Sequence, residues 1–246
     1  MSWDLLYYVV AGFLAQIVDG ALGMAYGVTA SSLLMSAGVP PAAASATVHA
    51  AECFTTGASA LSHRAFGNIS RTLFHRLLLP GVIGAVIGAY VLTALPGDTL
   101  KPWIAGYLLA LGLYIIAKAF HAFTPKEVTT HLTPLAFMGA LLDAIGGGGW
   151  GAIVTSNLLA RGNDVREAIG SVNAVEFFVT LASSAVFLAT LGLGHWRIIA
   201  ALALGGLLAA PLGGWLVGRV PRRPMMVVVG LLIVGLSART LWLSLA

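Results

Sequence analysis

The sequence predicts an all-helical integral membrane protein built from two related halves, and three observations carry that prediction. The chain has 246 residues, of which 59% are hydrophobic and only 9% are charged, whereas a soluble domain carries about 25% charged residues. The apolar residues form long segments, and the sequence repeats itself at a fixed offset. Because a membrane-spanning helix needs ~20 apolar residues, this length accommodates roughly six to eight crossings.

The composition also excludes several classes of protein. A single cysteine, Cys53, rules out an intrachain disulfide and a cysteine zinc cluster. The net charge of +4 would suggest a nucleic-acid partner in a soluble protein. Here the mean hydropathy is +0.93, and basic residues in short loops orient membrane helices, so we expect no nucleic-acid partner. The first apolar stretch lacks a basic region and a cleavage site, so no cleavable signal peptide is expected.

The internal repeat has an offset of 124 residues. The segment Phe13–Asp19 recurs as Phe137–Asp143. Farther along, the matching positions are Val48, Ala50, Glu52, Phe54 and Thr56 against Val172, Ala174, Glu176, Phe178 and Thr180. A glutamate that matches a glutamate inside two apolar segments is rarely a coincidence. The sequence therefore predicts two repeats, at residues 1–124 and 125–246, within one membrane domain.

Each half contains four apolar segments, and the first of them is interrupted by glycine. The segments are 5–37, 41–62, 73–95 and 102–121 in the first half, and 132–160, 165–190, 196–218 and 224–244 in the second. The interruptions lie at Gly20–Gly23 and Gly146–Gly149, and each glycine costs ~1 kcal/mol relative to alanine in a helix. An opened backbone in lipid must be buried in protein or line a cavity. Each first segment is therefore a kinked span or a re-entrant hairpin.

The distribution of positive charge favours re-entrant hairpins. If all eight segments crossed the membrane, the 13 lysines and arginines would divide almost evenly between its two sides. If both broken segments turn back, ten fall on one side: Arg64, Arg71, Arg76, Lys118, Lys126, Arg161, Arg166, Arg219, Arg222 and Arg223. Lys101, Arg197 and Arg239 fall on the other. The positive-inside rule expects this asymmetry, so we predict six crossings, two hairpins, an inverted repeat and both termini outside.

The two interruptions are the predicted substrate site. In inverted-repeat transporters the site lies near the midplane, where broken helices from the two halves meet. The half-helices that follow the breaks would start near Ala25 and Gly149, and their unpaired N–H groups favour an anion. The alternative is that these glycines only permit close helix packing. The predicted substrate-binding residues at the tips are Gly23, Tyr26, Gly27, Gly147, Gly148, Gly149, Trp150 and Gly151.

Four acidic residues are the predicted coupling groups. Asp19 and Asp143 lie just before the breaks, and Glu52 and Glu176 lie near the middle of their segments. A charged side chain there costs roughly 2.5–3.5 kcal/mol and usually faces a cavity or a partner. We expect these carboxylates to couple transport to H⁺ or Na⁺. Alternatively, each glutamate clamps a hairpin and each aspartate caps a broken helix. The residue three positions before each glutamate shares its helix face and joins the substrate-binding set: His49 and Asn173.

The sequence gives no sign of an enzyme or an ATP-driven pump. A phosphate-binding loop, a His-Glu-x-x-His motif and a nucleophile elbow are all missing from the sequence. We therefore expect a transporter without cofactor or bound metal, in contact with the bilayer, as a monomer or a homodimer. A passive anion channel of the same fold is the alternative, and an intramembrane enzyme is a more distant one.

Several segments, taken in order, resemble a known family. They are Asp19–Thr29, Ser62–Asn68, Gly146–Gly151 and Gly170–Asn173. The chain resembles the sulfite exporter TauE/SafE family over nearly its whole length, including the duplicated layout. The resemblance implies a plasma-membrane transporter of small anions that works without ATP, with sulfite, sulfonates and related organosulfur compounds as typical substrates. The first tip departs from the glycine-rich second tip at Leu22, Met24 and Ala25.

Overall fold

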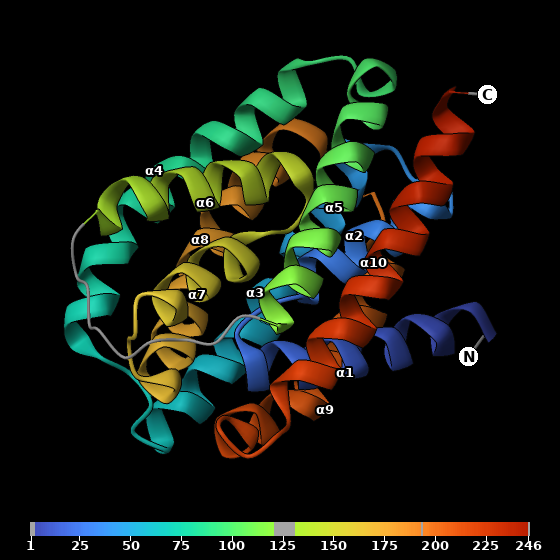
Figure 1. Cartoon of the computed structure of the whole chain (residues 1–246). Coiled ribbons are helices and arrows are strands. Elements are labelled where there is room, and N and C mark those ends of the chain that lie inside the picture. The colour runs from blue at the N-terminus through green and yellow to red at the C-terminus, as the bar shows by residue number, and fades with distance from the viewer. Residues whose placement is uncertain (1–2, 121–130, 193, 246) are drawn as a thin grey trace.

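The computed structural model describes residues 3–120, 131–192 and 194–245, which form ten helices and no strand (Figure 1). The first half contains α1 (Trp3–Leu22), α2 (Tyr26–Ser36), α3 (Pro41–Ala65), α4 (Arg71–Ala94) and α5 (Gly97–Ala119). The second half contains α6 (Leu132–Gly146), α7 (Trp150–Ala160), α8 (Val165–Leu191), α9 (Trp196–Leu216) and α10 (Arg222–Leu245).

The helix boundaries confirm the segmentation predicted from the sequence. The first apolar segment of each half is split into two helices, at residues 23–25 and 147–149, and the other segments each form one helix. The half-helices begin at Tyr26 and Trp150, one residue after the positions expected. Lys126 and the last residue of the predicted segment 102–121 lie outside the described residues.

In each half the two helices of the broken segment contact each other. A Cβ atom built on Gly139 of α6 would lie 2.8 Å from Cγ2 of Val154 in α7. In one continuous helix, residues 15 positions apart would be about 22 Å apart. In the first half, Leu14 of α1 and Leu33 of α2 line one groove. Each glycine interruption therefore separates two helices that pack against each other, as the α6–α7 pair in Figure 1 illustrates.

The helices of the two halves interlock in matched pairs. Helix α1 packs against α9, and its counterpart α6 packs against α4. Helix α3 packs against α9, and its counterpart α8 packs against α4. The remaining large contacts join counterparts directly, α3 with α8 and α5 with α10. Every major contact thus has a partner in which the roles of the halves are exchanged.

The bundle has two ends that differ in charge. The inner end is defined as the end at which α3, α5, α7 and α9 finish. The outer end is defined as the end at which α2, α4, α8 and α10 finish. At the inner end the Arg223 guanidinium lies 4.3 Å from the Phe120 ring centroid, and at the outer end Arg239 donates a hydrogen bond to the Ser36 carbonyl. The inner end carries Arg64, Arg71, Arg76, Lys118, Arg161, Arg166, Arg219, Arg222 and Arg223, and the outer end carries Lys101, Arg197 and Arg239.

Six of the described helices are long and apolar enough to cross a membrane: α1, α4, α5, α8, α9 and α10. The number equals the six crossings predicted, but the set differs, because α1 is included and α3 is not. Helix α3 has 25 residues, yet many of its buried residues are polar, including Ser45, Thr55 and Ser59. Ser45 donates to the carbonyl of Ala144 in α6, Ser59 donates to Asn173 in α8, and Thr55 lies against Gly206 of α9. These polar side chains lower the hydropathy of α3 while remaining buried.

Candidate functional site

The two helix breaks cross at the centre of the molecule. A Cβ atom built on Gly27 would lie 2.9 Å from the Cα atom of Gly148, and one built on Gly151 would lie 2.7 Å from the Cα atom of Met24. The backbones therefore touch, and a side chain at these glycines would separate them. The tip residues predicted from the sequence are brought together here: Gly23, Gly27, Gly147, Gly148, Gly149 and Gly151.

Two hydrogen bonds join the breaks, and the sequence analysis missed both. The Thr155 hydroxyl donates to the carbonyl of Gly23 at 2.7 Å, and the Ser31 hydroxyl donates to the carbonyl of Gly147. Ser31 and Thr155 are 124 residues apart, as are Gly23 and Gly147, so the same bond is made twice. The signal that could have revealed them is a hydroxyl residue at one repeat position in both halves. These bonds satisfy carbonyls that the interrupted helices leave open.

Asp19 and Asp143 cap the half-helices. The backbone N–H of Trp150 donates to Oδ1 of Asp143 at 2.9 Å, and the backbone of Tyr26 makes the corresponding bond to Asp19. Of the two roles that the sequence left open for the aspartates, capping is therefore observed. A carboxylate of the protein thus already occupies the position in front of each half-helix N-terminus.

The four predicted coupling residues form one buried group, which we call the carboxylate cluster. The exposed fractions are 1% for Asp19 and Glu52, 2% for Asp143 and 5% for Glu176. The four carboxyl groups interact electrostatically with one another. One oxygen atom each of Asp19, Glu52 and Glu176 lacks a hydrogen-bond partner among the described residues. The repeat thus brings four acidic groups from α1, α3, α6 and α8 to one place.

His49 belongs to this cluster, and its repeat counterpart has a different role. His49 Nε2 lies 3.0 Å from Oδ2 of Asp143. Asn173, at the equivalent position of α8, accepts a hydrogen bond from Ser59 at 2.8 Å and donates one to the carbonyl of Ile169. The two halves are therefore alike in their carboxylates and unlike in the residue that accompanies them.

Tyr26 and Trp150 are anchored inside the helix bundle. Both side chains are almost completely buried. The Tyr26 hydroxyl lies 3.2 Å from the carbonyl of Leu202, to which it donates. Trp150 Nε1 donates to the carbonyl of Val172 at 3.3 Å. Each ring therefore fixes the first turn of its half-helix against a neighbouring helix.

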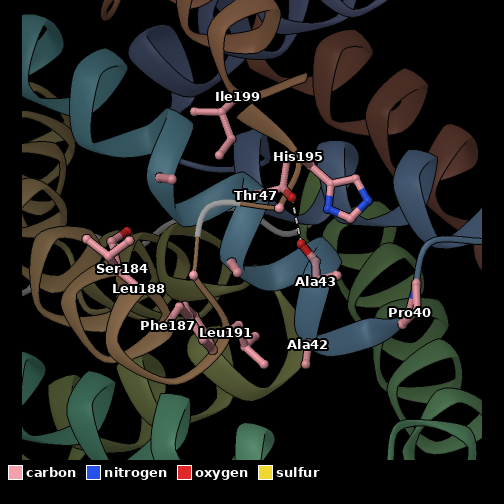
Figure 2. Close-up of a pocket in the computed structure, with 14 residues that line it drawn as sticks. Pro40, Ala42, Ala43, Thr47, Ser184, Phe187, Leu188, Leu191, His195 and Ile199 are labelled. Atoms are coloured by element: carbon pink, nitrogen blue, oxygen red, sulfur yellow. Dashed lines mark hydrogen bonds between the residues drawn. The ribbon is translucent and has the colours of Figure 1, made fainter. Parts of the chain in front are cut away.

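A cavity of about 320 Å³ opens between the start of α3, the end of α8 and the start of α9 (Figure 2). We call it the outer vestibule, and its lining includes Ala46, Ala50, Ser184, Phe187, Leu191 and His195. The Phe187 ring lies 5.7 Å from the His49 ring, centroid to centroid. Phe187 thus forms a floor between the vestibule and the His49–Asp143 pair. The sequence analysis did not predict this cavity, because it depends on how three helices splay apart.

The described residues form a helical bundle with six candidate membrane spans, in which two broken segments meet beside buried carboxylates. Broken helices that meet in this way are found in membrane transporters. The chain belongs to the sulfite exporter TauE/SafE family, which it matches over residues 8–240. This confirms the resemblance seen in the sequence.

Two curated relatives carry transporter names. The chain is 42% identical over 247 residues to "Probable membrane transporter protein YtnM" of Bacillus subtilis (strain 168), covering 96% of this chain and 82% of the relative. It is 28% identical over 218 residues to "Probable membrane transporter protein ORF9" of Sinorhizobium sp, covering 85% and 81%. No solved structure matches the chain.

Proposed function

We propose that the protein is a proton-coupled secondary transporter of small anions in the plasma membrane, with sulfite or organosulfonates as the substrate class. The observation that carries the proposal is the carboxylate cluster at the crossing of the two breaks. The proposed substrate class follows from the family, and the proposed coupling of anion transport to protons follows from the carboxylate cluster.

The cluster links anion binding to proton binding. Two like charges 4 Å apart repel by about 4 kcal/mol at an effective dielectric constant of 20. An anion that approaches Asp19, Glu52, Asp143 and Glu176 therefore needs protons to enter with it. The unpaired oxygens of Asp19, Glu52 and Glu176 are positions at which protons can be held without breaking an existing hydrogen bond.

The tips of the two helix breaks and His49 form the proposed anion-binding site. The backbone N–H groups of Tyr26 and Trp150 donate to Asp19 and Asp143. When these two carboxylates become protonated and neutral, the anion binds beside the same N–H groups. His49 supplies the positive group on the side of the outer vestibule. Because this anion-binding site lies between the two halves, it can open to either end of the bundle as the halves rock against each other.

The two halves, residues 1–124 and 125–246, are proposed to form an inverted repeat. Three observations support this: the paired hydrogen bonds of Ser31 and Thr155, the exchanged helix contacts and the charge difference between the ends. Helix α2 finishes at the outer end and α7 at the inner end. In this arrangement α1–α2 and α6–α7 are hairpins that enter the membrane from opposite sides.

The test is flux of sulfite and a panel of sulfonates and carboxylates into proteoliposomes, with and without an imposed pH gradient. Glu176→Gln removes a cluster carboxylate, Glu52→Gln does so at the equivalent position, and Glu167→Gln makes the same change at an exposed site of α8. We expect saturable, gradient-dependent flux that is lost in the two cluster variants and kept in Glu167→Gln.

Other outcomes discriminate the alternatives. A dependence on a sodium gradient instead of a pH gradient would assign the coupling to Na⁺. Flux that does not saturate, and that never accumulates solute against its gradient, would indicate a passive channel. If no anion of the panel moves, the proposed substrate class is wrong.

A further inference from the structure

The two ends of the α3–α8 pair differ. These helices are repeat counterparts that run antiparallel and meet where a Cβ atom on Gly57 would contact the Phe177 ring. At the outer end they diverge around the outer vestibule. At the inner end Asn68 and Ser70 instead contact α8 directly, and a separate cavity of about 350 Å³ is lined by their neighbours Gly67, Ile69 and Arg71.

Four residues close the inner end, and we call them the inner latch: Asn68, Ser70, Gly170 and Ser171. A Cβ atom on Gly170 would overlap the backbone carbonyl of Asn68, so the two backbones are in contact. The backbone N–H of Ser70 donates to the Ser171 hydroxyl at 2.9 Å. The Asn68 side chain also donates to the carbonyl of Gly214 at 3.0 Å, which adds α9 to the closure.

The counterparts of the latch residues line the outer vestibule. At the repeat offset of 124, Gly170 and Ser171 correspond to Ala46 and Thr47 of α3, and Asn68 corresponds to Gly192. All three of these outer residues border the cavity. The same positions therefore touch at the inner end and stand apart at the outer end.

We propose that the structure is the outward-open state of the carrier, that the outer vestibule is its entrance, and that it closes when Gly192 packs against Ala46 and Thr47 as the inner latch separates. This inference rests on the proposed transport function. Small residues allow this closure. Ala46 and Gly192 are small enough for the two backbones to approach each other as those of Gly170 and Asn68 do at the inner end. Closure would remove the cavity above Phe187 and shield the carboxylate cluster from outside.

Cysteine accessibility in intact cells tests the state without requiring a known substrate. The native cysteine is first replaced by Cys53→Ser, since its thiol lies 3.4 Å from Ser184 of the vestibule. Ala50→Cys then reports on the vestibule. Ala174→Cys is its matched control, the same substitution 124 residues on, where the side chain is only 4% exposed.

We expect a membrane-impermeant maleimide added outside to label Ala50→Cys at least about tenfold faster than Ala174→Cys, because a minor conformer is populated at roughly 0.1–10%. Equal labelling of the two positions, or faster labelling of Ala174→Cys, would overturn the assignment of the open end.

A cross-link tests the latch itself. Ser70→Cys with Ser171→Cys in the Cys53→Ser background places two thiols across the inner closure, where a short bis-methanethiosulfonate reagent bridges them through two reducible disulfide bonds. We expect the bridge to abolish flux, a reductant to restore it, and a third cysteine at Ala50 to remain reactive while the bridge holds. Undiminished flux in fully cross-linked protein, or failure of the bridge to form, would contradict the latch. If no solute is transported at all, the proposed function fails while the labelling pattern still decides which end is open.

Discussion

The two helix breaks perform the same structural task with different residues. Residues 147–149 are three glycines, all with positive φ, whereas residues 23–25 are glycine, methionine and alanine, with Ala25 held at φ 98°. An L-residue in that region costs roughly 1–2 kcal/mol. Both breaks nevertheless make the same cap and the same crossing hydrogen bond. The comparison teaches that contacts between the halves impose the turn, even where the local sequence disfavours it.

The breaks also differ in the ionic partner of the capping aspartate. Asp143 accepts a backbone bond and also pairs with His49, whereas one oxygen of Asp19 has no partner among the described residues. Among the described residues, a histidine therefore accompanies one of the two capping aspartates and not the other.

The largest expected difference is between Asp143→Asn and Asp19→Asn. Asp143→Asn removes one partner of a buried ion pair, which typically costs about 3–5 kcal/mol of stability. Asp19→Asn removes a carboxylate that has no basic partner among the described residues and is repelled by the other carboxylates, so we expect it to leave stability nearly unchanged. Thermal unfolding of the purified protein in detergent measures both. Equal losses would show that His49 and Asp143 do not form a stabilising pair.

A smaller difference in stability is expected between Gly149→Ala and Ala25→Gly. The two residues occupy equivalent repeat positions, and the two substitutions are the reverse of each other. A Cβ atom at Gly149 would overlap the Tyr107 hydroxyl, and its φ of 140° is unfavourable for alanine. Overpacking and backbone strain together should cost roughly 2–4 kcal/mol. Ala25→Gly relieves strain and should change stability by less than about 1 kcal/mol. If both variants melt at the same lowered temperature, the first break is not strained as described.

The smallest effects should be equal in the two halves. Ser31→Ala and Thr155→Val each delete one crossing hydrogen bond and leave a glycine carbonyl unpaired, at a cost of about 1–3 kcal/mol. Thr190→Val is the control, because Thr190 is exposed and, among the described residues, its hydroxyl donates to carbonyls of its own helix. The unfolding midpoints of Ser31→Ala and Thr155→Val should fall together and below that of Thr190→Val. Clearly different midpoints for Ser31→Ala and Thr155→Val would show that the two hydrogen bonds between the breaks are not equivalent, which contradicts the proposed symmetry of the halves.

The sequence located the breaks and the acidic residues, but not the partners of those residues. Glycine runs and isolated carboxylates inside apolar segments are local signals, so both breaks and all four cluster members were found. The His49–Asp143 pair joins residues 94 positions apart, and nothing in either segment specifies the other. The set of apolar helices was also only partly right, because the polarity of α3 depends on its burial between α8 and α9.

By itself the sequence determined the helices, the two interruptions and the repeat, because lipid requires long apolar helices and glycine interrupts them wherever it clusters. The tertiary structure alone decided that the two breaks cross, that the carboxylates meet there, and that α3 and α8 diverge around a cavity at the outer end while Gly170 touches Asn68 at the inner end. Those outcomes depend on which small residues come into contact between distant helices. Ala46 and Gly170 have similar neighbours in the sequence, yet one borders a cavity and the other touches backbone.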